Sequence, residues 1–143
     1  MLRVRLSPDD YKNYELSAWV DSEGFSGQGS GWFSDTEILE FASGLLSVAS
    51  FAKKEARLLG GPVGASMPGE YCLDIRAYPI DSLGHFGVQV ALRRGLFDRE
   101  RIEQCPSVML EVVTDTSSLE QFGSGLRELL QGGRDEAVLG SSN

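Results

Sequence analysis

The chain has 143 residues, and its 21 acidic and 13 basic side chains give a net charge of −8. This length fits one domain that is large enough to bury a core. The acidic balance argues against nucleic acid as a direct ligand, because neutralising phosphates requires clustered Lys and Arg. The first ten residues lack the apolar run of a signal peptide, and no segment approaches the ~18 apolar residues of a membrane span. We therefore expect a cytoplasmic protein without membrane contact.

The two cysteines, Cys72 and Cys105, form neither a CxxC pair nor a metal-binding pattern. In a chain of this size they indicate reduced thiols, with a disulfide between them as the alternative. No zinc-protease, phosphate-loop, nucleophile-elbow or calcium-loop motif occurs. The sequence thus predicts no metal and no cofactor.

Three strands are predicted at the start of the chain, over residues 2–6, 14–20 and 25–33. Apolar and polar residues alternate in them with the period of a half-buried strand. Turn-forming residues Asp21 to Gly24 predict a hairpin that pairs Val20 with Phe25.

The third strand carries glycine at every second position, at Gly27, Gly29 and Gly31. Glycine weakens a strand, so three glycines on one face indicate that another backbone or a ligand comes close. We expect the helix that follows to fold back over this face. A glycine-lined nest for an anion or small ligand is the alternative.

A capped helix follows the glycine strand. Ser34 and Glu37 have the spacing of a capping box, and apolar residues at helical spacing predict a helix from Asp35 to about Leu58. Glycines and Pro62 end the helix, and residues 61–69 show no periodicity and are predicted to be a loop.

The second half of the chain predicts three more strands, over residues 73–78, 86–92 and 107–114. In the hairpin formed by the first two, Ala77 is placed opposite Phe86. A second capping box, from Ser117 to Glu120, then begins a helix that ends near Gly132.

The predicted order is therefore βββαβββα. It favours an α+β fold in which one antiparallel sheet of about six strands carries both helices on one face. A single domain is expected over residues 1–133, followed by a frayed tail over residues 134–143. The two halves share the outline of strands followed by a capped helix, but no sequence repeat supports a duplication.

The single histidine, His85, falls in a turn and is expected to be exposed. A nucleophilic pair of His85 with Cys72 is disfavoured, because about five residues of strand would separate them. The open face of the sheet is a better candidate for function, since Trp, Tyr and Arg are enriched in binding hot spots. The candidate partner-binding residues are Trp19, Gln28, Ser30, Trp32, Asp74, Arg76 and Tyr78.

Three segments carry a resemblance to a known group of proteins: ELSAWVDSEGFSGQGSGWFSDTEILEFASGL, CLDIRAYPIDSLGHFGVQVAL and EVVTDTSSLEQFGSGLREL. From about Leu2 to Leu130 the chain resembles a family of small acidic bacterial proteins, most of them uncharacterised. Some members resemble immunity proteins of polymorphic toxin systems. The resemblance implies a protein that binds and blocks a toxin domain, and it supplies no catalytic motif.

From these observations we expect a non-catalytic cytoplasmic binding protein, of which an immunity-type inhibitor of a basic toxin domain is one form. Acidic charge would steer such a protein towards a basic partner. Two alternatives remain open: a small-molecule binding module or minor enzyme that uses the glycine strand, and a homodimer without a separate partner.

Overall fold

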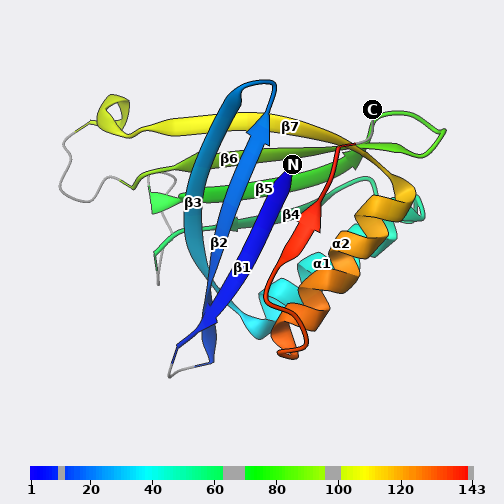
Figure 1. Ribbon diagram of the computed structural model, residues 1–143, viewed down its shortest axis with the longest axis horizontal. Coiled ribbons are helices and arrows are strands. Elements are labelled where there is room, and N and C mark those ends of the chain that lie inside the picture. The colour runs from blue at the N-terminus through cyan, green and yellow to red at the C-terminus, as the bar shows by residue number, and fades with distance from the viewer. Residues whose placement is uncertain (10–11, 63–69, 96–100, 142–143) are drawn as a thin grey trace.

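The computed structural model describes residues 1–9, 12–62, 70–95 and 101–141 (Figure 1). Its elements in chain order are β1 (Leu2–Pro8), β2 (Asn13–Ser22), β3 (Phe25–Ser34), α1 (Asp35–Ala49), β4 (Ala56–Gly60), β5 (Leu73–Pro79), β6 (His85–Arg93), the short 3₁₀ helix η2 (Ile102–Gln104), β7 (Ser107–Asp115), α2 (Thr116–Leu130) and β8 (Ala137–Leu139). Most of the loop predicted over residues 61–69 lies outside the described residues.

The strands form two antiparallel sheets of four strands each. Sheet A has the order β3-β2-β1-β8, and sheet B has the order β4-β5-β6-β7. The α+β class and the antiparallel pairing are confirmed, whereas the single sheet of about six strands is wrong. Figure 1 shows that the strands of sheet A cross those of sheet B at a steep angle.

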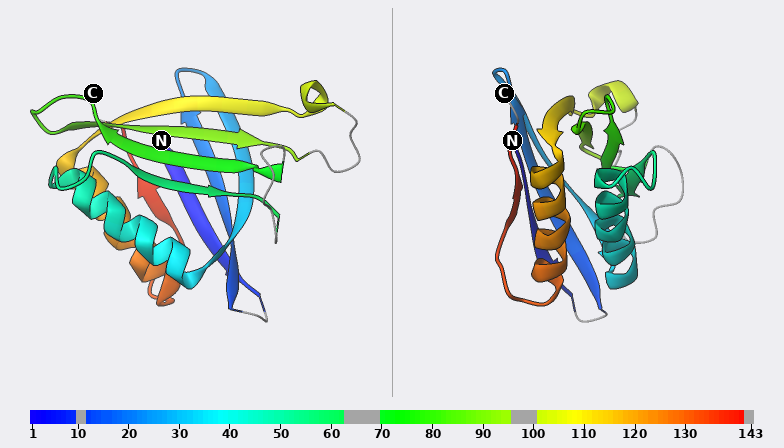
Figure 2. Two further views of the ribbon diagram at one scale, coloured as in Figure 1. Left: turned by 180° about the vertical axis from the view of Figure 1, so that it is seen from behind. Right: turned by 90° about the vertical axis from the view of Figure 1, so that its right-hand side faces the viewer.

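The two helices lie side by side in the space where the sheets diverge (Figure 2). Helix α1 contacts β4 and β5, and helix α2 contacts β8, so each sheet has one covered inner face. Apolar residues from both sheets and both helices form one continuous core, which includes the fully buried Phe33, Phe86 and Phe122. The outer face of each sheet carries no helix.

Two short strands were missed in the sequence. Helix α1 ends at Ala49 instead of continuing to Leu58, because Phe51 takes a left-handed conformation (φ 62°) that no α-helix can accommodate. The residues beyond it form β4, which pairs with β5. The tail expected to fray contains β8, whose Ala137 and Leu139 are fully buried.

Both predicted hairpins form with a register that differs by two residues from the prediction. Glu23 and Gly24 make a two-residue turn with positive φ at both positions, so Val20 pairs with Gly27. In sheet B, Ala77 pairs with Val88. A shift of two residues preserves the face on which each side chain lies, and the predicted buried faces are therefore correct.

Of the two predicted capping boxes, the first is present and the second is not. The capping box of Ser34 and Glu37 is present at the start of α1. The box predicted at Ser117 is not formed, because α2 begins earlier: the Asp115 carboxylate accepts a hydrogen bond from the Ser118 backbone N–H at 2.8 Å.

The two halves of the chain have the same plan. Helices α1 and α2 each have 15 residues, and aligning their first residues places Phe41 on Phe122 and Gly44 on Gly125. Each half is a three-stranded meander, a helix and one more strand, and that last strand joins the other half's sheet: β4 pairs with β5, and β8 pairs with β1. The similar outline of the halves is therefore an internal structural repeat.

None of the described helices is both long and apolar enough to cross a lipid bilayer.

Candidate functional site

The structure divides the seven candidate residues between two surfaces. Trp19, Gln28, Ser30 and Trp32 lie on the outer face of sheet A, and Asp74, Arg76 and Tyr78 lie on the outer face of sheet B. They do not form one cluster, because the predicted single sheet is two sheets.

On sheet A the two tryptophans are half-buried at the surface rather than in the core. The guanidinium carbons of Arg3 and Arg5 each lie 5.7 Å from the centre of the Trp19 ring, within cation–π range. Glu136 holds both arginines, with its carboxylate 3.7 Å from Arg3 and 3.1 Å from Arg5. Trp19 is therefore fixed in orientation while part of its ring remains accessible.

On sheet B polar groups cover most of the outer face. Arg57 forms a two-pronged ion pair with Asp74, with N–O distances of 2.9 and 2.8 Å. Arg76 lies over the Tyr78 ring at 5.1 Å, and the Tyr78 hydroxyl donates a hydrogen bond to Glu111. Burial and that hydrogen bond raise the pKa of Tyr78 to about 12. This network is a structured face, and each of its charged groups already has a partner.

The sequence predicts that helix α1 covers the glycines of β3. In the structure these glycines lie against sheet B instead. A β-carbon at Gly27 would overlap Val108 of β7, and one at Gly29 would stand 3.1 Å from Leu92 of β6. Further along, the Trp32 backbone N–H donates to the Gly61 carbonyl at 2.8 Å. Close packing of sheet B, through side chains such as Val108 and Leu92, is thus the reason for the glycines, and the expectation that helix α1 covers this face was wrong.

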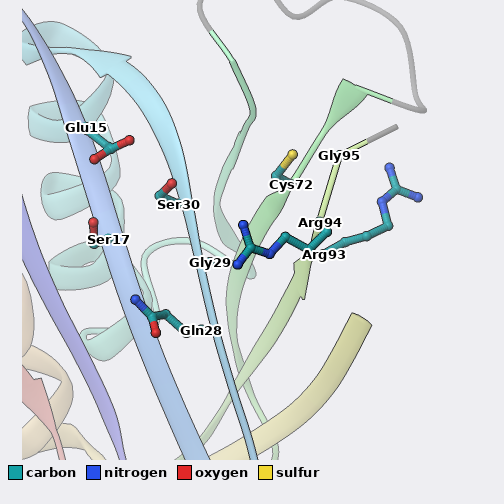
Figure 3. A pocket seen from close by; sticks show the side chains of 9 residues that line it. All are labelled: Glu15, Ser17, Gln28, Gly29, Ser30, Cys72, Arg93, Arg94 and Gly95. Carbon is teal, nitrogen blue, oxygen red and sulfur yellow. The ribbon is translucent and has the colours of Figure 1, made fainter. Parts of the chain in front are cut away.

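The crossing of β3 over sheet B creates a polar cleft at the corner of the molecule (Figure 3). Its volume is about 370 Å³. Figure 3 shows Glu15, Ser17, Gln28 and Ser30 on the β2–β3 side of the gap, and Arg93 and Arg94 at the end of β6 on the other side. Its lining comprises Glu15, Ser17, Gln28, Gly29, Ser30, Cys72, Arg93, Arg94 and Gly95.

Several polar groups of this corner cleft have no protein partner. Within the described part of the chain, the Glu15 carboxylate and the Arg94 guanidinium make no hydrogen bond or ion pair. By contrast, Arg93 donates to the Tyr71 carbonyl at 2.8 Å and is held against the wall. Burial raises the pKa of the Cys72 thiol, which is therefore protonated at neutral pH. The cleft thus presents one free anion and one free cation with a neutral thiol beside them.

An adjacent groove connects the cleft with the outer face of sheet B. It has a volume of about 510 Å³ and shares Cys72 and Arg93 with the cleft. Its floor includes Leu59, Ala91 and the exposed Met109, beside Asp74. The corner cleft and this groove therefore meet at Cys72 and Arg93.

The internal repeat gives the cleft a counterpart. The alignment of the two halves places Ser26 on Ser107. Ser26 pairs with Asp21 and Ser107 pairs with Arg93, so Asp21 and Arg93 occupy equivalent positions. A second hollow lies at the equivalent corner, where β7 passes the end of β2, and is lined by Met1, Asp21, Ser22, Glu23, Glu111, Val113 and Ser141. The fold thus forms two similar corners with different charges. Two arginines, Arg93 and Arg94, line the first, whereas three acidic residues line the second.

The single histidine lies far from this corner. His85 is exposed at the start of β6, and its Nδ1 is 2.7 Å from Asp81. The Leu83 backbone N–H and the His85 ring lower the pKa of Asp81. Cys72 is at the opposite end of the β5–β6 hairpin, so the two residues do not meet. Over the described residues, no group of three or more His, Cys, Asp or Glu side chains could hold a metal ion.

Arg93 and Arg94 were missed in the sequence, since they follow the last apolar residue of their strand and lie in a charged segment without periodicity. Only the crossing of β3 over the end of β6 brings them to Gln28 and Ser30. Both cysteines are free thiols.

No protein-family model matches this chain, and neither the curated proteins nor the solved structures contain a match to it.

Proposed function

We propose that this chain is a non-catalytic binding protein that engages a protein partner through the outer face of sheet A. The observation that carries the proposal is the pair of half-buried tryptophans, Trp19 and Trp32, on a sheet face that no helix covers. Large aromatic side chains that are held in place bind at low entropic cost and are frequent binding hot spots. Their neighbours Gln28 and Ser30 supply hydrogen-bonding groups at the same face.

The partner that fits the charge of this chain is a basic protein domain. A net charge of −8 steers association with a positively charged surface. An immunity-type inhibitor of a toxin domain would act in this way. Neither Trp19 nor Trp32 belongs to the core, so both can be replaced without unfolding the chain.

The test is a calorimetric titration with a purified basic domain encoded next to this chain. We expect a 1:1 complex that the double variant Trp19→Ala, Trp32→Ala loses, while the free energy of unfolding falls by no more than about 2 kcal/mol. The matched control is Phe51→Ala, which removes an exposed aromatic ring elsewhere on the surface and should leave affinity unchanged. Equal affinity of the double variant and the wild type would contradict the proposal.

A second candidate function is small-molecule binding in the corner cleft. The specific observation in its favour is that Gln28 and Ser30, from the glycine strand, line a polar cleft of about 370 Å³. This volume lies at the lower end of the range for small-ligand sites. Trp32 does not line the cleft, so the tryptophan variants above separate this function from protein binding.

A further inference from the structure

The corner cleft offers opposite charges to a ligand. Glu15 lies on β2 and Arg94 follows β6, so they belong to the two walls of the cleft (Figure 3). Neither side chain is neutralised by another described residue, and the two are not within ion-pair distance of each other. A molecule in the cleft can therefore reach a carboxylate at one wall and a guanidinium at the other.

Neutral polar groups lie in the same cleft. The hydroxyls of Ser17 and Ser30, which pair across the β2–β3 ladder, and the amide of Gln28 have no hydrogen-bond partner in the described part of the chain. Hydroxyl and amide groups both donate and accept. They suit a ligand whose middle portion carries an amide.

The internal repeat shows that these charges are not imposed by the fold. At the equivalent corner, Asp21 occupies the place of Arg93 and Ser22 that of Arg94. The same backbone arrangement therefore exists without the two arginines. The basic wall of the corner cleft is a property of its sequence alone.

We infer that the corner cleft binds a small zwitterion of the short-peptide class. Glu15 receives the ammonium group, Arg94 receives the carboxylate, and Gln28 and the two serines bond to the peptide amide between them. Guanidinium and carboxylate form charge-assisted hydrogen bonds, which are stronger than those between neutral groups. This inference rests on the second candidate function and names its ligand.

The experiment measures the affinity of the full chain for alanyl-alanine by calorimetry, beside N-acetyl-alanyl-alanine, alanyl-alanine amide and free alanine. We expect the dipeptide to bind, and each capped form to bind about tenfold or more weakly because it lacks one charge. Glu15→Gln and Arg94→Gln should each weaken the dipeptide about tenfold, whereas Lys54→Gln, an exposed cation outside the cleft, should have no effect.

A second readout locates the ligand. Cys72 lines the cleft and Cys105 is buried, so bound dipeptide should slow alkylation of Cys72 by iodoacetamide. Equal affinity for the dipeptide and its N-acetyl form would overturn the zwitterion while leaving small-molecule binding in place. Tighter binding of free alanine would overturn the peptide class. Absence of binding by all four probes would overturn the inference and leave the second candidate function standing, because that function is not restricted to amino-acid ligands.

Discussion

Gly27 of β3 lies against Val108 of β7 so closely that a β-carbon at position 27 would overlap the Val108 side chain. This contact joins the edge strand of sheet A to the edge strand of sheet B. At this position the backbone of β3 packs directly on a side chain of β7, and no side chain of β3 lies between them.

The first prediction concerns this contact. Gly27→Ala should lower the free energy of unfolding by about 1–3 kcal/mol, since Val108 is β-branched and cannot turn aside. Adding Val108→Ala should recover part of the loss, as measured by urea unfolding of the single and double variants. Gly140→Ala is the control, because nothing lies within 4 Å of its added β-carbon. Strictly additive losses would contradict the contact.

The helix glycines give a second prediction. A β-carbon at Gly44 would stand 3.0 Å from Ala56 Cβ, and one at Gly125 would stand 3.2 Å from Ala137 Cβ. Alanine gains about 1 kcal/mol of helix propensity, but here it must displace a strand. We expect Gly44→Ala to be less stable than wild type by up to about 2 kcal/mol and Gly125→Ala to be affected less.

Thermal unfolding of the two helix variants checks this order. The companion variant Gly44→Ala, Ala56→Gly should regain stability by removing the opposing methyl group. If both single variants proved more stable than wild type, the helices would not be packed as closely as the structure shows.

The sequence predicts which side chains are buried, but it does not predict which helices and strands pack against one another. Alternation placed Leu73, Ile75 and Phe86 correctly in the core, because period-2 patterns report which face is buried whatever the strand pairs with. The end of α1 was missed because the helical break is at Phe51, a residue type that gives no warning of positive φ. Strand β4, with five residues, was too short to show alternation beside a helix pattern.

The candidate site was predicted only in part for a related reason. Alternation correctly placed Gln28, Ser30 and both tryptophans on one outer face. It could not show that Asp74 lies on a different sheet, nor that Arg94 would reach the glycine strand, because both depend on contacts between segments far apart in sequence.

Buried Thr114 supports a third prediction. Its side chain is fully buried, and its hydroxyl has no hydrogen-bond partner among the described residues. Thr114→Val replaces this hydroxyl with a methyl group of similar size and should raise the free energy of unfolding by about 1 kcal/mol. Thr114→Ser retains the hydroxyl, loses the methyl group and should be less stable than wild type. A valine variant less stable than wild type would show that the hydroxyl has a partner, such as a water molecule.

The cap of α2 leads to a fourth prediction, on acid stability. The hydrogen bond from the Ser118 backbone N–H lowers the pKa of Asp115. Its folded pKa therefore lies below the unfolded value of about 3.9, so the stabilisation is complete above that value and is lost as pH falls through the folded pKa. Asp115→Asn keeps an acceptor for the cap but cannot ionise.

We expect the wild type to exceed Asp115→Asn in stability at pH 7, with the difference shrinking below about pH 4 as Asp115 becomes protonated. Chemical unfolding at a series of pH values measures this difference. A difference that stays constant from pH 7 to pH 3 would show that ionisation of Asp115 contributes nothing to the cap.

The exchange of last strands between the two halves has an evolutionary consequence. A half-length ancestor of this plan could complete its sheet only with the last strand of a second copy, so it would have been an obligate strand-exchanged dimer with two identical corners. In one chain that holds both halves, the two corners need not be identical. Asp21 and Arg93, which occupy equivalent places in the two halves, differ in this way: one corner carries an acidic side chain where the other carries a basic one.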